Sequence, residues 1–346
     1  MLFANRRVRN VVPKVSKSPR SVDLFAGAGG LSLGLKMAGW QTVVASDFDS
    51  AACATYRRNF PEVKVLEGDV RSVNWSTLRG QVELVAGGPP CQPFSVAGNQ
   101  RASNDARDMI PEFIRAVREI QPPLFLMENV GGLVASRNFA YFDARLEELR
   151  GLGYSVKYSV LNSAHFGVAQ ERLRVIVIGS RIQDPYFPIP THGTQEQPFL
   201  SARDAIFSSP VDEPNTAIVT YARTPVIRPS PWAGMLVNGG GRPIDLDSPS
   251  QTIPASAGGN RTHIVDQNGI LLDYHSYLIA GGKPREGIVQ GVRRLTVRES
   301  ASLQSFPHSF NFEGKKSAQY RQVGNAVPPL LGKAVGTAVL NLLGDA

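Results

Sequence analysis

The sequence predicts an α/β protein with a doubly wound sheet, followed by a second, smaller and more irregular region. From Ser21 onward, short β-branched or apolar runs alternate with stretches of helical periodicity, which is typical of a parallel sheet covered by helices. After Arg181 this alternation gives way to a long stretch crowded with Pro, Gly, Ser and Thr. With 346 residues, 42% of them hydrophobic, the chain is long enough for one large domain and a smaller one, and disorder is excluded for most of it.

Seven short runs rich in apolar and β-branched residues are predicted as strands, at residues 22–25, 42–45, 63–66, 82–86, 124–127, 155–161 and 175–179. Four stretches between them carry apolar residues at roughly helical spacing and are predicted as helices, at residues 31–38, 51–59, 111–120 and 139–152. Gly39 and Gly151 are stop signals for the first and the last of these helices.

The stretch after Arg181 is either a disordered linker or a small folded domain. Its apolar anchors favour an irregular, β-rich small domain; they are Tyr221, Trp232, Ile253, Tyr274 and Tyr277. Helical periodicity returns at residues 296–304 and 327–343. We therefore divide the chain into an N-terminal tail at 1–20, a large domain made of 21–181 and 319–346, and a smaller domain with its hinge at 182–318.

The net charge of +8 comes mostly from the first 20 residues, which hold six Lys or Arg and no acid. From Ser21 onward 31 cations face 29 acids, so bulk charge gives little support for a nucleic-acid partner. The tail is interpreted as a solvated extension, with a DNA-contacting arm or a transit peptide as alternatives.

No run of 18 apolar residues and no secretory signal occur, so we expect no membrane span and an intracellular protein. Two cysteines and five scattered histidines lack metal-ligand spacing, and no metal is expected.

The first predicted strand runs into a glycine turn, DLFAGAGG at residues 23–30, and then into a helix. Such a turn lets a ligand approach the backbone closely at the free N–H groups of the helix. Asp47 ends the second strand, where a doubly wound fold places a ribose-hydroxyl partner. Ser32 stands where a dinucleotide fingerprint needs a third glycine, which favours a smaller adenosyl ligand over NAD. Asp69, after the third strand, either accepts an adenine amino group or caps a helix.

The fourth predicted strand ends in GGPPCQPFS, residues 87–95, at the edge where open α/β sheets keep their sites. Most lone cysteines are inert core residues, but the prolines before and after Cys91 restrict the backbone and fix the direction of the thiol. With a lowered pKa, this thiol is a candidate nucleophile. Cys53 has no such setting and is predicted to be a core residue.

Charged residues adjoin two later strands. Glu128 ends an apolar strand, where a carboxylate is either an ion-pair partner or a catalytic acid beside the thiol. Arg172 and Arg174 open another strand and lie on one face of it, because side chains alternate along a strand. Alone, this pair is typical of a solvated edge.

Together these motifs resemble the cytosine-C5 DNA methyltransferases. The resemblance covers residues 21–179 and resumes from about 292 to the C-terminus, with the motifs in the family's order: 23–34, 46–49, 68–70, 89–92, 105–107, 128–130, 170–174, 294–307 and 324–329. Asp47 stands where many members carry Glu, a departure that we do not expect to affect function.

The resemblance implies a Rossmann-like domain that binds S-adenosylmethionine and releases S-adenosylhomocysteine. The implied cofactor contacts are Phe25, Gly27, Gly29, Asp47, Phe48, Asp69, Val70, Pro89, Asn325 and Ala326. Cys91 would add to C6 of cytosine, Glu128 would hold N3 and the exocyclic amine, and Arg172 would hold the O2 side. Arg174 would support phosphate or loop position, and Gln92 completes the implied catalytic set.

The resemblance further implies that the base is flipped out of double-stranded DNA. Residues 182–318 would then form the target recognition domain and its hinge. A cytoplasmic bacterial monomer that shares its recognition site with a restriction endonuclease is expected. Transfer RNA cytosine methylation, a nicotinamide dehydrogenase and a non-catalytic DNA-binding relative are the alternatives. The presence of Cys91, Glu128 and Arg172 together argues against the last.

Overall fold

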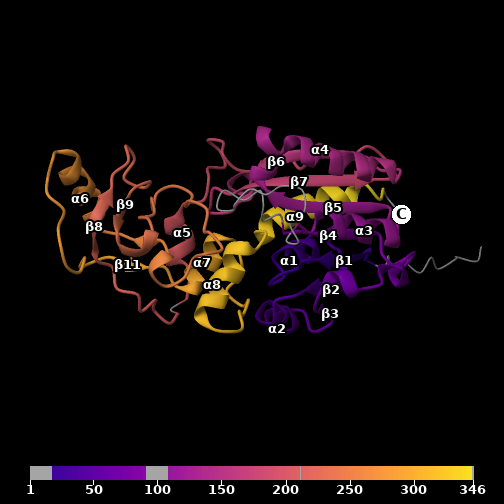
Figure 1. Cartoon of the computed structure of the whole chain (residues 1–346), viewed down its shortest axis with the longest axis horizontal. Helices are drawn as coiled ribbons and strands as arrows, with labels where there is room; N and C mark the ends of the chain where they lie inside the picture. Colours follow the sequence, from indigo (N-terminus) through magenta and orange to yellow (C-terminus); the bar gives the residue numbers. More distant parts are fainter. Residues whose placement is uncertain (1–17, 91–107, 211, 345–346) are drawn as a thin grey trace, which may run out of the picture.

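The computed structural model of the chain describes residues 18–90, 108–210 and 212–344. Figure 1 shows an elongated molecule with two lobes. We call the end that contains the large sheet the sheet lobe; it comprises β1–β7, α1–α4 and α9. The other end, the second lobe, comprises α5–α8 and β8–β11. Among the described residues, no helix is long and apolar enough to cross a bilayer.

The sheet lobe is built on seven strands in the order β3-β2-β1-β4-β5-β7-β6. Their bounds are Arg20–Leu24 (β1), Gln41–Asp47 (β2), Lys64–Glu67 (β3), Leu84–Gly87 (β4), Leu124–Val130 (β5), Ser155–Asn162 (β6) and Leu173–Ser180 (β7). Each predicted strand overlaps one of these seven. The expectation of a parallel sheet is wrong at β7, which runs antiparallel to both β5 and β6. The connection from β6 to β7 is too short for a crossover helix, so the chain returns in the opposite direction.

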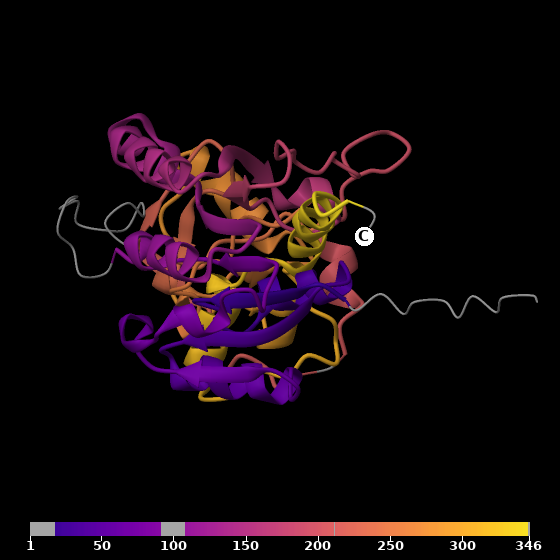
Figure 2. The same cartoon turned by 90° about the vertical axis from the view of Figure 1, so that its right-hand side faces the viewer.

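Helices cover both faces of this sheet, as predicted for a doubly wound fold. Their bounds are Gly30–Met37 (α1), Ser50–Asn59 (α2), Ile110–Ile120 (α3), Ser136–Gly151 (α4) and Pro329–Asn341 (α9). Along β5, Phe125 and Met127 pack with α3 and α4, whereas Leu124 and Leu126 pack with α1 and α9. Figure 2 looks from the end of the sheet lobe and shows α3 and α4 on one side of the strands and α9 on the other.

Alpha helix α9 comes from the C-terminal part of the chain and packs directly on α1. A Cβ atom added at Gly34 would lie 2.5 Å from the carbonyl carbon of Gly332, so the two backbones meet where both residues lack a side chain. Beyond this contact, Leu31 and Leu35 of α1 share one apolar cluster with Leu331 of α9. The C-terminal segment is therefore part of the sheet lobe's core.

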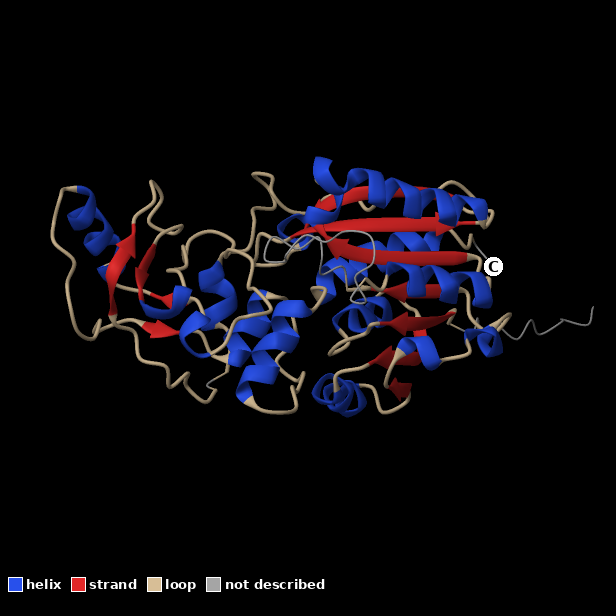
Figure 3. Cartoon of the chain, in the orientation of Figure 1, coloured by secondary structure: helices blue, strands red, loops and turns tan. Residues whose placement is uncertain are grey.

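The second lobe is mainly irregular, as Figure 3 shows. Its elements are α5 (Ala202–Phe207), β8 (Tyr221–Val226), β9 (Met235–Val237), β10 (Ile264–Val265), α6 (Ile270–Ile279), β11 (Arg293–Arg294), α7 (Val297–Leu303) and α8 (Lys316–Asn325). The expected β-rich character is not confirmed, because its strands form two sheets of two strands each. The predicted helix at 296–304 is confirmed as α7, with a capping box made by Thr296 and Glu299. The sequence analysis missed α5, α6 and α8.

Short 3₁₀ turns complete the described elements: η1 (Val70–Ser72), η2 (Trp75–Leu78), η4 (Gly131–Val134), η5 (Ser163–Phe166), η6 (Asn238–Gly240) and η7 (Gly259–Arg261).

An apolar cluster joins the lobes. In it, Tyr56 and Phe60 of the sheet lobe lie with Phe306 and Phe310, and the rings of Phe60 and Phe310 are 6.2 Å apart. The lobes therefore share a core at their junction.

Candidate active site

The predicted motifs meet at one edge of the sheet. Strands β2, β1, β4 and β5 are neighbours and run parallel, so their carboxyl ends lie side by side. The glycine turn follows β1, Asp47 ends β2, Gly87 ends β4, and Glu128 lies near the end of β5. This edge thus has a side at β1–β3 that carries the predicted cofactor residues and a side at β4, β5 and β7 that carries the predicted catalytic residues.

The glycine turn is fastened to the end of β2. The backbone N–H of Gly27 donates to Oδ2 of Asp47 at 2.8 Å, and that of Asp49 donates to Oδ1 at 2.9 Å. Burial raises the pKa of Asp47, partly offset by these hydrogen bonds. Phe25, Gly27 and Gly29 all have positive φ, and a Cβ added at Gly27 would meet nothing within 4 Å. The turn therefore leaves open space against its backbone, as a closely bound ligand requires.

A buried polar chain lies beneath this turn, and the sequence analysis did not predict it. Ser32 was considered only as a missing glycine, but its hydroxyl donates to Oδ2 of Asp23 at 2.6 Å, and the hydroxyl of Tyr56 donates to Ser32 at 2.6 Å. Asp23 is fully buried, and its Oδ1 has no hydrogen-bond partner among the described atoms. Burial raises the pKa of Asp23 to about 7. Ser32 therefore holds a buried acid in place.

The segment after α8 closes against the start of α1. A Cβ added at Gly30 would lie 2.3 Å from the carbonyl oxygen of Val327 and 3.2 Å from Cβ of Ala326. Asn325, the last residue of α8, is exposed. The structure thus brings Ala326, a predicted cofactor contact far away in the sequence, next to the glycine turn.

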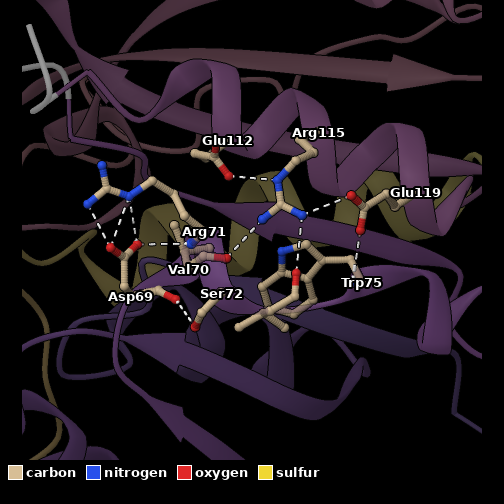
Figure 4. A network of polar contacts seen from close by, with 9 residues as sticks. Asp69, Val70, Arg71, Ser72, Trp75, Glu112, Arg115 and Glu119 are labelled. Atoms are coloured by element: carbon tan, nitrogen blue, oxygen red, sulfur yellow. Dashed lines mark hydrogen bonds and ion pairs between the residues drawn. The ribbon is translucent and has the colours of Figure 1, made fainter.

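Two other predicted cofactor residues follow β2 and β3. The Phe48 side chain is 82% exposed, so its ring is available to a ligand. Asp69 caps η1 by accepting the N–H of Arg71 at 2.9 Å, which is the alternative role foreseen for it. The guanidinium of Arg71 also binds both carboxylate oxygens of Asp69, at 2.6–2.9 Å, and these bonds lower the pKa of Asp69 to about 2 (Figure 4).

Side chains of helix α3 reach the backbone of the η1–η2 segment (Figure 4). Arg115 of α3 donates to the carbonyl oxygens of Val70 at 2.9 Å and Val73 at 3.1 Å, and it pairs with Glu112 and Glu119. The sequence analysis did not single out Arg115, since its only signal was helical spacing from two acids. Val70, a predicted cofactor residue, is therefore held through its carbonyl group by the helix that follows the cysteine segment.

On the catalytic side, Glu128 is 8% exposed and forms an ion pair with Arg174, with Nε and Oε1 2.7 Å apart. A Cβ added at Gly88 would lie 3.0 Å from Oε2 of Glu128, so the backbone after β4 passes directly over this carboxylate. The side-chain amide of Asn129 donates to the carbonyl oxygen of Pro89 at 2.9 Å. Asn129 therefore holds the segment that leads into Cys91, and this segment lies against Glu128.

Cys91 and Gln92 lie outside the described residues, as do residues 105–107 and residues 1–17 of the N-terminal tail. The chain on both sides of the gap is described: the N–H of Met109 donates to the carbonyl oxygen of Pro90 at 3.0 Å. Cys53 is fully buried, and burial raises the pKa of its thiol to about 12, which confirms it as a core residue.

Arg172, which directly precedes β7, and Arg174 of β7 are both buried with Leu173 exposed between them, as predicted for two residues on one face. The contacts distinguish the two side chains. The guanidinium beside Glu128 is that of Arg174, whereas Arg172 is 1% exposed and donates to the carbonyl oxygens of Ile253, Gly324 and Ala326. Burial lowers the pKa of both arginines. Register alone placed both residues correctly but did not reveal which neighbour each would find.

Comparison with known proteins gives a consistent result. The model of the C-5 cytosine-specific DNA methylase family matches residues 20–341. Type II methyltransferase M1.HphI of Haemophilus parahaemolyticus is 37% identical over 333 residues, which cover 93% of this chain and 86% of the relative. Type II methyltransferase M.NgoMIV of Neisseria gonorrhoeae is 33% identical over 324 residues, which cover 93% and 97%.

Solved structures show the same fold at low sequence identity. The Dnmt2 methyltransferase of S. pombe superposes with a TM-score of 0.68 at 18% identity, over 95% of this chain and 100% of that one. The methyltransferase EhMeth of Entamoeba histolytica gives a TM-score of 0.69 at 16% identity, with the same coverage. The match of the family model over most of the chain, the two relatives above 30% identity and the placement of the motifs at one sheet edge agree: the chain belongs to the C-5 cytosine-specific DNA methylase family.

Proposed function

We propose that this methyltransferase modifies C5 of a cytosine within a specific short sequence of double-stranded DNA, as the modification enzyme of a type II restriction–modification system. The relatives named above support the last point, since both are called Type II methyltransferases. The observation that carries the proposal is the Glu128–Arg174 ion pair. It lies under the backbone of Gly88, a residue that precedes Cys91 by three positions. A cognate restriction endonuclease, a monomeric state and a cytoplasmic location belong to the same proposal.

The chemistry requires activation of the base, because C5 of cytosine is a poor nucleophile. In the proposed reaction the Cys91 thiolate forms a bond to C6, and the electrons of the C5–C6 double bond make C5 nucleophilic. S-adenosylmethionine supplies an electrophilic methyl group. Loss of the C5 proton then expels the Cys91 thiolate and restores the ring.

Glu128 and Arg174 act on the polar edge of the base in this scheme. Glu128 holds N3 and the exocyclic amine as charge develops on the ring, and its ion pair with Arg174 fixes its orientation beforehand. Arg174 takes over the role expected for Arg172 on the O2 side, because its guanidinium is the one beside Glu128. Gln92 stays in the proposed catalytic set through its position next to Cys91.

The residues at the β1–β3 side fit an adenosyl ligand. The open backbone at Gly27 accommodates the amino-acid part, Asp47 faces the ribose, and the exposed ring of Phe48 stacks on the adenine. Asp69 and Val70 contact the adenine edge, while Phe25, Gly29, Pro89, Asn325 and Ala326 line the remainder. Asp47 already accepts two N–H groups, so a ribose hydroxyl binds to its remaining lone pairs.

Because the target atom is buried in a duplex, the cytosine must leave the stack, which costs a few kcal/mol. We assign residues 182–318 to DNA recognition and to the hinge between the lobes. The carbonyl oxygen of Ile253, a residue of this segment, accepts a hydrogen bond from Arg172, which is two residues before Arg174. This contact next to the catalytic side supports the assignment. Methylation of transfer RNA is the alternative substrate class.

The test is incubation of the purified chain with labelled S-adenosylmethionine and either duplex DNA of diverse sequence or transfer RNA. Base-resolution mapping should show 5-methylcytosine in one short DNA context. Label in RNA but not in DNA would replace the DNA proposal, and label in neither would contradict both.

A second experiment addresses the covalent step. A duplex with 5-fluorocytosine at the mapped position should trap the wild-type protein, since fluorine does not leave as the proton does. Cys91→Ala should form no adduct and show no turnover, yet bind S-adenosylhomocysteine like the wild type. A trapped complex with Cys91→Ala would show that another residue is the nucleophile.

A further inference from the structure

Arg172 occupies an unusual position for a charged side chain. Its guanidinium is 1% exposed and lies where three segments meet: β7, the second-lobe segment at Ile253, and the turn after α8. Nη1 donates to the Ile253 carbonyl at 3.3 Å, and Nη2 donates to those of Gly324 at 2.8 Å and Ala326 at 2.9 Å. Among the described residues no carboxylate pairs with it, because Glu128 is engaged by Arg174. Its buried partners are therefore backbone carbonyls, so its effect is to fix backbone.

A continuous seam surrounds Arg172 on the second-lobe side. The N–H of Glu171 donates to Ser250 O at 2.8 Å, and the N–H of Ser250 donates to Ala169 O at 2.9 Å. The hydroxyl of Thr252 donates to Glu171 O at 2.6 Å. These bonds run along the backbone up to Arg172, whose guanidinium adds the last bond of the seam, to Ile253.

The bonds on the other side enclose a cofactor residue. Gly324 and Ala326, whose carbonyls share Nη2 of Arg172, flank Asn325. Gly324 is also held close to the second lobe, because a Cβ added there would lie 2.4 Å from the carbonyl oxygen of Pro254. Arg172 thus fixes the backbone on both sides of Asn325.

The same turn supports the glycine turn of the cofactor side. Ala326 and Val327 lie against Gly30, where an added Cβ would contact both. A shift of residues 324–327 would therefore displace the start of α1. Two residues along β7 from Arg172, Arg174 holds Glu128. Arg172 is connected through short contacts to both sides of the candidate active site.

We propose that Arg172 is a positioning residue for the cofactor, which locks the turn around Asn325 between β7 and the second lobe, and not a residue that contacts the base. This inference rests on the proposed function, because it takes Asn325 and Ala326 as cofactor contacts. Lysine at this position keeps a cation but replaces a planar fork by one ammonium group, which cannot reproduce the three bonds in their geometry. The turn around Asn325 then loses part of its support.

The chain offers a matched control in Arg294, which is also 1% exposed. Its guanidinium donates to Thr262 O at 2.9 Å, Asn238 O at 3.0 Å and Asn238 Oδ1 at 2.8 Å. Arg294 therefore has the same burial and three oxygen acceptors but lies within the second lobe and does not contact the turn at Asn325. Arg294→Lys should disturb folding about as much as Arg172→Lys without a specific effect on the cofactor.

The experiment measures the Kd of S-adenosylhomocysteine by calorimetry without DNA, together with kcat at saturating S-adenosylmethionine. Arg172→Lys should weaken binding by about tenfold or more, the loss of one to two charge-assisted hydrogen bonds, and keep kcat within about threefold. Arg174→Lys should do the reverse, lowering kcat by about a hundredfold with little change in Kd. Arg294→Lys should leave Kd unchanged.

A collapse of kcat in Arg172→Lys with wild-type affinity for S-adenosylhomocysteine would overturn the inference in favour of a base contact. If Arg172→Lys does not fold, Gly324→Ala replaces it: its added Cβ would lie 2.4 Å from the carbonyl oxygen of Pro254 and would shift the backbone of Gly324, whose carbonyl accepts from Arg172, while the arginine stays. Weaker cofactor binding by Gly324→Ala supports the inference, and wild-type binding overturns it. Failure of the wild-type protein itself to bind S-adenosylhomocysteine would contradict the proposed function instead.

Discussion

The sheet lobe and the second lobe satisfy their buried backbone groups in different ways. In the sheet lobe, seven neighbouring strands pair with one another, and apolar side chains fill the layers on both faces. In the second lobe the strands are short, and buried side chains bond to backbone groups of loops and of a helix start. Arg294 bonds to the carbonyl oxygens of Thr262 and Asn238, and Asp266 accepts the N–H groups of Ile270 and Leu271, the first two residues of α6, at 3.0 and 2.7 Å.

This difference determines which substitutions reduce the stability of each lobe. A buried polar side chain that serves backbone groups is costly to remove, since its partners stay buried without hydrogen bonds. In the sheet lobe strand pairing satisfies the backbone of the strands, and the buried charged residues Asp23, Glu128, Arg172 and Arg174 lie at the edge that holds the candidate site. Asp23 bonds to a side chain, the Ser32 hydroxyl, whereas Arg294 of the second lobe bonds to backbone carbonyls. The following predictions test this contrast.

The largest expected effect is the pH dependence of stability caused by Asp23. Burial raises its pKa from 3.8 to about 7, so the folded protein binds this proton more tightly than the unfolded chain. Its contribution to stability is therefore complete below pH 3.8 and is lost as the pH rises through 7, by about 4 kcal/mol in total. Urea unfolding of the wild type and Asp23→Asn, from pH 5 to pH 8, measures the part of this loss that falls in that interval, about 2.6 kcal/mol.

Asp23→Asn removes the titrating group and keeps a side-chain oxygen for the Ser32 hydroxyl. The wild type should therefore lose stability relative to Asp23→Asn as the pH rises across this interval. Equal pH dependence of the two proteins would show that Asp23 is not protonated in the fold, and that the sheet lobe tolerates a buried carboxylate.

A smaller loss is expected from Arg294→Met in the second lobe. Methionine fills part of the volume but leaves the buried carbonyl oxygen of Thr262 and the partly buried one of Asn238 without a donor, which costs about 3 kcal/mol. Urea unfolding at pH 7 gives the stability, and the Kd of S-adenosylhomocysteine shows whether the cofactor side is affected. A loss under 1 kcal/mol would contradict the view that side chains hold the second lobe's backbone.

The same contrast explains what the sequence could predict. Repetition reveals the sheet lobe: strands such as β5 are apolar on both faces, and the helices between them carry regular apolar spacing, so all seven strands were found. The antiparallel orientation of β7 was not predicted, because it depends on the short connection from β6 and not on the residues of the strand itself. In the second lobe, α8 was missed because its residues show no clear periodicity.

Site residues were likewise predictable where a local pattern marks them and not where their contacts are distant in sequence. Glu128 and Asp47 were predicted because they end strands whose neighbours are fixed by topology. The partners of Arg172 lie 81 and more residues away, on segments whose course no local pattern encodes, so its contacts could not be predicted. Resemblance to a family located the motif, but only the assembled contacts distinguish Arg172 from Arg174.

The smallest expected effect concerns an exposed ion pair in each lobe. Arg71 binds Asp69 at the cofactor side, and Arg203 binds Asp247 in the second lobe, and all four side chains are largely exposed. Exposed pairs contribute little to stability, so Arg71→Ala and Arg203→Ala should both unfold at nearly the same urea concentration as the wild type. Arg71→Ala should nevertheless strengthen S-adenosylhomocysteine binding about two- to threefold, since Oδ2 of Asp69 then becomes free for the adenine amino group while Oδ1 still accepts the backbone N–H of residue 71. Arg203→Ala should leave Kd unchanged. Weaker binding by Arg71→Ala would mean that the arginine holds Asp69 in its binding position, and the ion pair would then belong to the cofactor site.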